Sequence, residues 1–275
     1  MRIVIPMAGK GERFLKHGYK DPKHLIKVGK DYMIKQALDK FPGEQDIVFI
    51  VNRTHLRKTQ IKNVLTELSP KAKIIPINYR KRGPVWAVIR ALSLDPNYIP
   101  DEKPILVSYC DFGVEWDYGK FIETLRNSKC DGCVVSYLGF HPHLLDREKR
   151  YAGMTVNNKN WVTAIKEKYS FTENLMDSHQ SAGSYYFRQG ILLKKYAKML
   201  LRLGKSVNGE YYVSQLYELM IKDGLRVLAY PVSYFLQWGT PEDLEHYKYW
   251  HNVFGSKNYF DLLSRLLGTQ KIRRY

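Results

Sequence analysis

A glycine-rich turn near the start of the chain carries residue types that bind phosphate groups. The apolar run at residues 3–5 leads into Gly9 and Gly11, and Arg13 and Lys23 follow. Two glycines one residue apart let the backbone approach a phosphate chain without Cβ clashes, and successive N–H groups of such a loop can point at oxyanions. The two basic side chains add the positive charge that a triphosphate needs. The pattern predicts a strand that leads into a phosphate-binding loop.

Two better-known nucleotide-binding motifs do not match this turn. A dinucleotide-binding fingerprint requires a third glycine three residues after Gly11, where the chain has Phe14, and the Gly-Lys-Ser/Thr of a P-loop is absent at this position. A lone Gly-x-Gly is also a common simple turn. The assignment therefore depends on residues farther along the chain.

Two further positions have the character of ligand-binding residues. Residues 105–108 predict a buried strand that leads to Asp111, and open α/β sheets bind ligands at the carboxyl ends of their parallel strands. Gly83 follows a basic loop and opens an apolar helix, and such a helix start suits a phosphate or the edge of a nucleobase. A simple turn-capping role is the alternative for both residues.

The elements that must position these residues follow from apolar periodicity. Strands alternate with helices over the first half of the chain, which is typical of a parallel sheet covered on both faces. Asp117 is expected to cap the helix that follows it. We predict strands at residues 3–5, 47–51, 73–77, 105–108, 132–139, 151–156, 161–165, 181–187 and 225–231, and helices at 32–41, 55–68, 83–92, 118–126, 191–203, 214–222 and from 248 onward.

The ordered set of motifs resembles the nucleotidyltransferase family that activates sugar 1-phosphates. The opening signature of that family matches Gly9-Lys10-Gly11-Glu12-Arg13 and Pro22-Lys23-His24-Leu25. Its closing signature, a strand that turns through Gly239-Thr240 into a helix that Pro241 starts, matches Trp-Gly-Thr-Pro-Glu-Asp-Leu at residues 238–244. The resemblance covers roughly residues 2–250. It implies a three-layer α/β/α, Rossmann-like nucleotidyltransferase fold with a mostly parallel mixed sheet. We expect one domain over residues 1–275, with a nucleotide-binding half at about 1–130, a sugar-phosphate-binding half at about 131–255 and a helical C-terminal tail.

The resemblance also implies roles for individual residues. Arg13 and Lys23 would counter the triphosphate, Asp111 would hold Mg²⁺ or Mn²⁺, and Lys168 would hold the phosphate of the acceptor. Gln237 stands where many members have a second metal-binding aspartate, so it would be at most a weak ligand. The nucleotide-binding residues would be Met7, Ala8, Gly9, Gly11 and Gly83, and the substrate-binding residues Tyr109, Gly153, Glu167, Lys168, Gly183 and Glu210.

The implied reaction joins a nucleoside triphosphate to a sugar 1-phosphate and releases pyrophosphate, for the synthesis of surface polysaccharide or glycoconjugates. One alternative is a cytidylyltransferase that acts on a non-sugar phosphate or a phosphonate. Another is an inactive relative that senses nucleotides or binds nucleic acid. No basic-aromatic motif of an RNA-binding type occurs, so we expect no nucleic-acid partner. The formation of homo-oligomers stays open.

Composition narrows the class of protein. The chain has 275 residues and 44% hydrophobic residues, enough to fill a sizeable core. No apolar run approaches the roughly 18 residues of a membrane span, and three cysteines are too few for a disulfide scaffold, so we expect a cytoplasmic protein. Cys130 and Cys133 have metal-like spacing, with His141 and His143 following, but Cys133 begins an apolar strand. The net charge of +17 indicates affinity for anions or a lysine-rich solvated surface.

Overall fold

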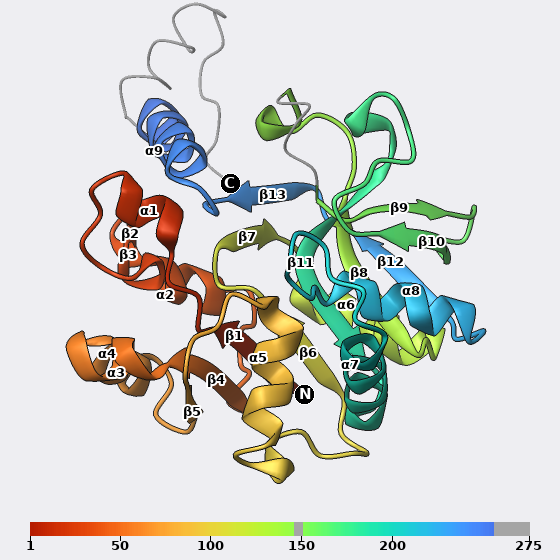
Figure 1. Ribbon diagram of the computed structural model, residues 1–275. Coiled ribbons are helices and arrows are strands. Elements are labelled where there is room, and N and C mark those ends of the chain that lie inside the picture. The colour runs from red at the N-terminus through yellow and green to blue at the C-terminus, as the bar shows by residue number, and fades with distance from the viewer. Residues whose placement is uncertain (146–150, 256–275) are drawn as a thin grey trace, which may run out of the picture.

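The computed structural model describes residues 1–145 and 151–255 (Figure 1). Within these residues, nine strands form a central sheet, two short strand pairs lie outside it, and helices cover it. The strands of the sheet are β1 (Arg2–Met7), β4 (Ile47–Asn52), β5 (Lys73–Ile77), β6 (Ile105–Ser108), β8 (Gly132–Tyr137), β9 (Gly153–Val156), β10 (Val162–Lys166), β11 (His179–Phe187) and β12 (Val227–Pro231). The short pairs are β2 (Lys27–Val28) with β3 (Asp31–Tyr32), and β7 (Phe112–Glu115) with β13 (Tyr234–Gln237). The helices are α1 (Glu12–Lys16), α2 (Met33–Leu38), α3 (Arg53–Lys58), α4 (Ile61–Leu68), α5 (Gly83–Leu92), α6 (Tyr118–Ser128), α7 (Gly190–Leu203), α8 (Ser214–Lys222) and α9 (Pro241–Gly255).

The sheet is mixed, and most of its strands run in one direction. β5, β4, β1 and β6 lie side by side in parallel. β11 runs antiparallel to β6, β8 and β9, and β10 runs antiparallel to β9, so β10 and β11 oppose the rest of the sheet. The predicted mostly parallel mixed sheet is therefore confirmed.

One edge of β11 is shared by two partners. Residues 184–187 of β11 pair with β6, and residues 179–180 pair with β9. The β9–β10 hairpin thus continues the sheet beyond the point where β6 ends. This arrangement leaves the segment that follows β6 free to turn out of the sheet with Asp111.

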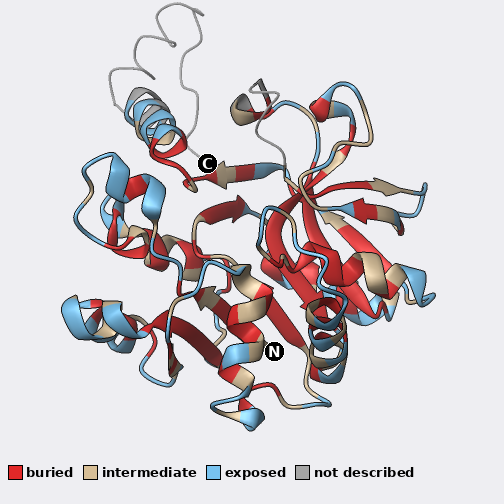
Figure 2. Ribbon diagram, viewed as in Figure 1, coloured by how far each residue is buried: buried red, intermediate tan, exposed pale blue. Residues whose placement is uncertain are grey.

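Two apolar clusters cover the two faces of the sheet, which gives the predicted three layers. α5, α7 and α8 pack on one face and are seen in front of the sheet in Figure 1. α2, α4 and α6 pack on the other face. Both faces of β1 are apolar, because the consecutive residues Ile3 and Val4 point to opposite faces and belong to different clusters. Helices therefore have to cover both faces. Figure 2 shows the strands as largely buried, in agreement with their apolar composition.

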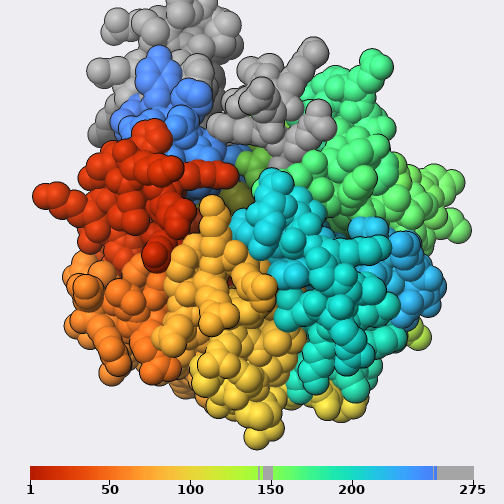
Figure 3. Space-filling view, viewed as in Figure 1, coloured from red at the N-terminus to blue at the C-terminus, as the bar shows by residue number. Residues whose placement is uncertain are grey.

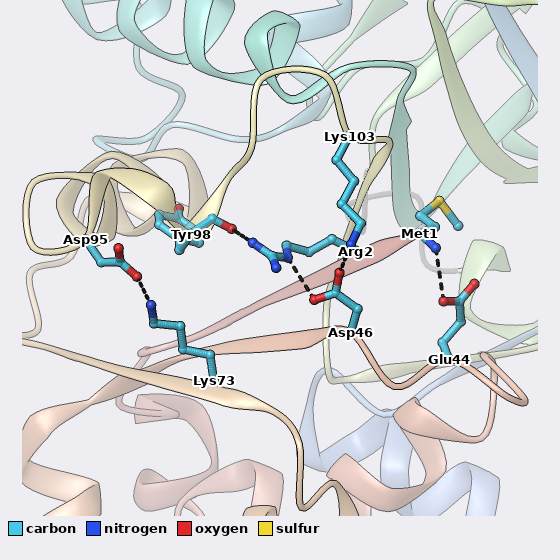
Figure 4. Close-up of polar contacts among 8 residues, drawn as sticks. All are labelled: Met1, Arg2, Glu44, Asp46, Lys73, Asp95, Tyr98 and Lys103. Carbon is cyan, nitrogen blue, oxygen red and sulfur yellow. Dashed lines mark hydrogen bonds and ion pairs between the residues drawn. The ribbon is translucent and has the colours of Figure 1, made fainter.

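A network of charged residues links the amino ends of the parallel strands (Figure 4). Arg2 donates to Asp46 at 2.9 Å and to the carbonyl of Tyr98 at 2.7 Å, and Lys103 also contacts Asp46. These contacts join β1 to the segments that precede β4 and β6. They fix the amino ends of the parallel strands and leave the carboxyl ends open for a ligand.

The predicted element boundaries are confirmed at several places, and one predicted helix is wrong. β5 and α5 have the predicted bounds, and the Asp117 side chain caps α6 by accepting from the Lys120 amide at 2.9 Å. The predicted helix over 55–68 is two helices, α3 and α4, because Thr59 between them adopts an extended backbone. The pair β7–β13 was not predicted as a sheet of its own. The tail beyond residue 255, with the basic residues at 271–274, lies outside the described residues.

None of the helices in the described residues is both long and apolar enough to cross a membrane.

Candidate active site

A cleft of roughly 610 Å³ opens at the carboxyl ends of β1 and β6. In Figure 3 the segments that border it are coloured red, gold and cyan and surround a recess in the face shown. It brings together residues from both halves of the chain. The predicted site residues that line it are Met7, Ala8, Gly9, Gly11, Arg13, Lys23, Gly83, Tyr109, Asp111, Lys168 and Glu210.

The glycine loop has the backbone that the sequence predicts. Gly11 lies in the left-handed region at φ +70°, which favours glycine, and a Cβ there would lie 3.4 Å from the Cβ of Lys23. A Cβ on Gly9 would meet nothing within 4 Å, so this residue faces open space. Arg13 is exposed on α1 and lines the cleft. The loop can therefore present backbone N–H groups and a guanidinium to an anion.

Lys23 and Asp111 form an ion pair at the floor of the cleft. Nζ of Lys23 lies 2.5 Å from Oδ2 of Asp111, and the side chains are 25% and 15% exposed. Burial is the largest effect and lowers the pKa of Lys23, but the charge of Asp111, the nearby Cys110 and the hydrogen bond to Asp111 together outweigh it, and the pKa is raised. Lys23 therefore stays a cation beside the carboxylate.

The segment that carries Asp111 is held by backbone contacts at both ends. The Tyr109 amide donates to the Gly183 carbonyl at 3.0 Å, and the Trp238 amide donates to the Asp111 carbonyl at 3.1 Å. A Cβ on Gly183 would lie 2.5 Å from the Phe112 ring, so this glycine permits close packing under the segment. The closing motif thus supports Asp111 from a distant part of the chain.

Basic and acidic side chains meet at the far side of the cleft. Lys168 lies in the left-handed region at φ +51°, a conformation that costs a non-glycine residue on the order of 1 kcal/mol. Its Nζ lies 5.1 Å from the centre of the Tyr212 ring, and the Tyr212 hydroxyl donates to Glu210 at 2.6 Å. These contacts orient Lys168 toward the same space that Arg13 and Lys23 face.

Glu167 is partly buried next to the cleft but does not line it. The Ser214 hydroxyl donates to its carboxylate. Burial raises the pKa of Glu167 to about 6, against the lowering effects of Ser214 and Lys168. The carboxyl group therefore titrates close to neutral pH.

Three other predicted residues also lie outside the cleft lining. A Cβ on Gly153 would lie 2.3 Å from the Tyr169 carbonyl, so this glycine allows β9 to pack against the segment after β10. Gly183 supports the Tyr109 segment as described above. The Gln237 side chain is buried and donates to Asp243, and its carbonyl oxygen has no hydrogen-bond partner within residues 1–145 and 151–255.

Gly83 lines the cleft, and the backbone at this position also requires a glycine. Its φ is +80°, and a Cβ there would lie 2.6 Å from the carbonyl oxygen and 2.7 Å from the amide nitrogen of Tyr211. The Tyr211 carbonyl also accepts from the Val85 amide at 3.1 Å. The start of α5 is therefore joined directly to the loop that carries Glu210.

Of the carboxylates that line the cleft, Glu210 accepts from the Tyr212 hydroxyl and Glu12 lies 3.8 Å from Lys81, which leaves Asp111 as the candidate to bind a divalent cation. Oδ1 of Asp111 accepts no hydrogen bond from the described residues, and no group of three or more His, Cys, Asp or Glu side chains among them is arranged to hold a metal ion. Mg²⁺ needs only one or two carboxylates when substrate phosphates and water complete its shell. The residues present therefore fit a cation that arrives with a triphosphate. Cys110, Cys130 and Cys133 are free and buried.

Sequence reasoning missed several residues of the cleft. Tyr79, Trp86, Asn208 and Tyr212 all line it. Lys10 places its ammonium 5.2 Å from the centre of the Tyr79 ring. The basic loop before Gly83 was a usable signal for Tyr79, whereas nothing local marked Asn208 or Tyr212.

Comparison with known proteins agrees with this geometry. A family model described as the MobA-like NTP transferase domain matches residues 3–275. A nucleoside-diphosphate-sugar pyrophosphorylase from Vibrio cholerae RC9 is similar, with a TM-score of 0.71, 20% identity, and coverage of 89% of this chain and 98% of that one. A protein from Bacillus anthracis, described as a candidate glucose-1-phosphate thymidylyltransferase and solved with a sucrose, has a TM-score of 0.66, 18% identity, and coverage of 91% and 94%. At these identities the two structures establish the likeness of the fold.

Proposed function

The chain belongs to the MobA-like NTP transferase domain family and is a nucleotidyltransferase, and from this premise we propose that it joins a nucleoside triphosphate to a sugar 1-phosphate. The products are a nucleotide-sugar and pyrophosphate, which would serve the synthesis of surface polysaccharide or glycoconjugates. The observation that carries the proposal is the single cleft that gathers the glycine loop, the Lys23–Asp111 pair and Lys168.

The proposed reaction needs charge neutralisation and alignment rather than a protein nucleophile. An oxygen of the acceptor phosphate attacks the α-phosphorus of the triphosphate, and the bond from that phosphorus to the β-phosphate oxygen breaks. Arg13 and Lys23 counter the charge on the triphosphate and on the departing pyrophosphate. Lys168 holds the acceptor phosphate on the opposite side of the cleft.

Asp111 is the residue that would hold Mg²⁺ or Mn²⁺. The bound cation would neutralise phosphate charge and polarise the reacting phosphate. Gln237 stays a weak candidate for a second ligand, with its amide nitrogen engaged by Asp243. We also propose that the chain acts as one domain, because both halves contribute to the cleft.

The test is a screen of all nucleoside triphosphates against a panel of sugar 1-phosphates, choline phosphate and a phosphonate, with Mg²⁺ present. We expect pyrophosphate only when both a triphosphate and a sugar 1-phosphate are added. Orthophosphate release without acceptor would show a hydrolase, and product with only choline phosphate or the phosphonate would replace the sugar in the proposal.

A pair of matched variants assigns the activity to the cleft. Asp111→Asn removes the carboxylate that would hold the cation and is expected to lower turnover by on the order of a hundredfold or more. Asp117→Asn makes the same change at the cap of α6, outside the cleft, and keeps a capping oxygen. Equal loss in both variants would contradict the assignment.

A further inference from the structure

Lys40 is a buried lysine behind the segment that carries Asp111. It follows α2, is 4% exposed and does not line the cleft. Its main-chain carbonyl accepts from the Trp116 indole at 2.9 Å, so the backbone of Lys40 is fixed as well. Among the described residues, no carboxylate lies within ion-pairing distance of its ammonium group.

The ammonium group of Lys40 instead contacts the end of β6. Nζ donates to the Ser108 hydroxyl at 3.0 Å and to the Tyr109 carbonyl at 3.2 Å. The Ser108 hydroxyl in turn lies 2.9 Å from that of Ser184 on β11. Lys40 therefore reaches through the core to the peptide group just before Cys110 and Asp111.

A lysine in this place is costly for the fold. Burial of a charge without an ion-pair partner is unfavourable, and neutral side chains of similar volume often stabilise such sites. Burial lowers the pKa of Lys40 to about 8, although the charge of Asp111 opposes the change. Packing alone would be served better by methionine, so the reason for the lysine lies in what its ammonium group contacts.

The contacts around Asp111 show what Lys40 adds. The Tyr109 amide is held by Gly183 and the Asp111 carbonyl by Trp238, both through backbone atoms. The Tyr109 carbonyl lies between these anchors, where it accepts from Lys40 at 3.2 Å and, at a longer 3.4 Å, from the Ser108 hydroxyl that Lys40 also contacts. Without Lys40, the carbonyl would keep only the longer contact to the Ser108 hydroxyl, and that hydroxyl would lose its own contact to the ammonium group. The peptide between Tyr109 and Cys110 could then rotate, and the Asp111 carboxylate would move with it.

We propose that Lys40 is a positioning residue for nucleotidyl transfer, which fixes the Tyr109 carbonyl and thereby the placement of Asp111 in the cleft. This inference rests on the proposed function. It assigns to Lys40 no contact with substrate. Its effect passes through the segment between Ser108 and Asp111.

The central experiment compares Lys40→Met with Lys35→Met. Lys35 lies on α2 and pairs with Asp39 at the surface, so its replacement is the matched control. We expect Lys40→Met to lower kcat roughly tenfold to a hundredfold, because a displacement of about 1 Å at a reacting centre has effects of this size. The KM values for both substrates should change less than about threefold, and the melting temperature should stay equal or rise. Lys35→Met should change none of these quantities appreciably.

A structural role would give a different result. If Lys40→Met lowers the melting temperature and activity together, or leaves kcat unchanged, the proposal is wrong. Hydrogen exchange provides a readout that does not need activity: peptides that cover residues 105–113 should exchange faster in Lys40→Met, with the rest of the sheet unchanged. If the wild type transfers no nucleotide to any acceptor, the proposed function fails, and unchanged exchange in this peptide would separately overturn the role of Lys40.

Discussion

The stability lost in the two single variants of the Lys23–Asp111 pair should add up to more than the stability lost in the double variant. The paired atoms are 2.5 Å apart, and both side chains are less than one third exposed. At that distance an effective dielectric constant of 20 gives a direct attraction of about 7 kcal/mol, most of which is offset by desolvation. Lys23→Met or Asp111→Asn alone leaves a partly buried charge, at a cost of roughly 3 kcal/mol. The double variant leaves neither, so we expect a coupling free energy of roughly 2–3 kcal/mol.

Urea denaturation of the wild type, the two single variants and the double variant measures this coupling. Near neutral pH is suitable, because the raised pKa of Lys23 means that its contribution is present below about 10.5 and is lost as pH rises through the folded value. The exposed pair Lys35–Asp39, with a separation of 2.7 Å, is the control and should couple by at most about 0.5 kcal/mol. A Lys23–Asp111 coupling as small as that of the control would refute the reasoning.

Three further outcomes follow from the site. Lys168→Ala should raise KM for the acceptor, and Arg13→Ala should raise KM for the triphosphate, each roughly thirtyfold for a loss of about 2 kcal/mol. Steady-state kinetics with each substrate varied measures both values. If Lys168→Ala raised KM for the triphosphate and Arg13→Ala KM for the acceptor, the assignment would be wrong. Gly83→Ala should cost roughly 2–4 kcal/mol of unfolding free energy, because its Cβ would lie 2.6 Å from the Tyr211 carbonyl at a positive φ, and an unchanged melting curve would contradict this. Because the pKa of Glu167 is raised to about 6, its protonated carboxyl group contributes stability that is fully present below about pH 4.5 and is lost as pH rises through 6. Glu167→Gln should therefore gain stability relative to the wild type above pH 6. Thermal unfolding of both proteins measures this, and their difference in melting temperature would stay constant with pH if the carboxyl group were not buried.

The sequence predicted elements well where apolar periodicity and local punctuation agree. α5 and β5 are such cases. The predicted helix over 55–68 failed because Thr59 offers the backbone an alternative: its hydroxyl donates to the His55 carbonyl at 2.8 Å and accepts from the Ile61 amide at 3.3 Å. β7 escaped prediction because it is short and its pairing partner is far away in the chain.

The candidate site divides in the same way. The glycine loop, Lys23 and Asp111 are local signals, and the structure places them in one cleft. Lys40 could not be found from sequence, because a lysine after a short amphipathic helix is typical of a solvated helix end, and its burial depends on Trp116 and on the end of β6. The predicted roles of Gly153, Gly183 and Gln237 in ligand binding stay predictions.

The support of Asp111 by Trp238 has a consequence for the order of events during protein synthesis. During synthesis the N-terminus of the chain leaves the ribosome first, and domains begin to fold as they emerge. All strands of the central sheet precede Trp238, because β12 ends at Pro231. A nascent chain can therefore assemble the sheet before the Asp111 carbonyl has its last partner. Products of interrupted translation would hold a sheet without a finished site, and they would leave the cell's nucleoside triphosphates unconsumed.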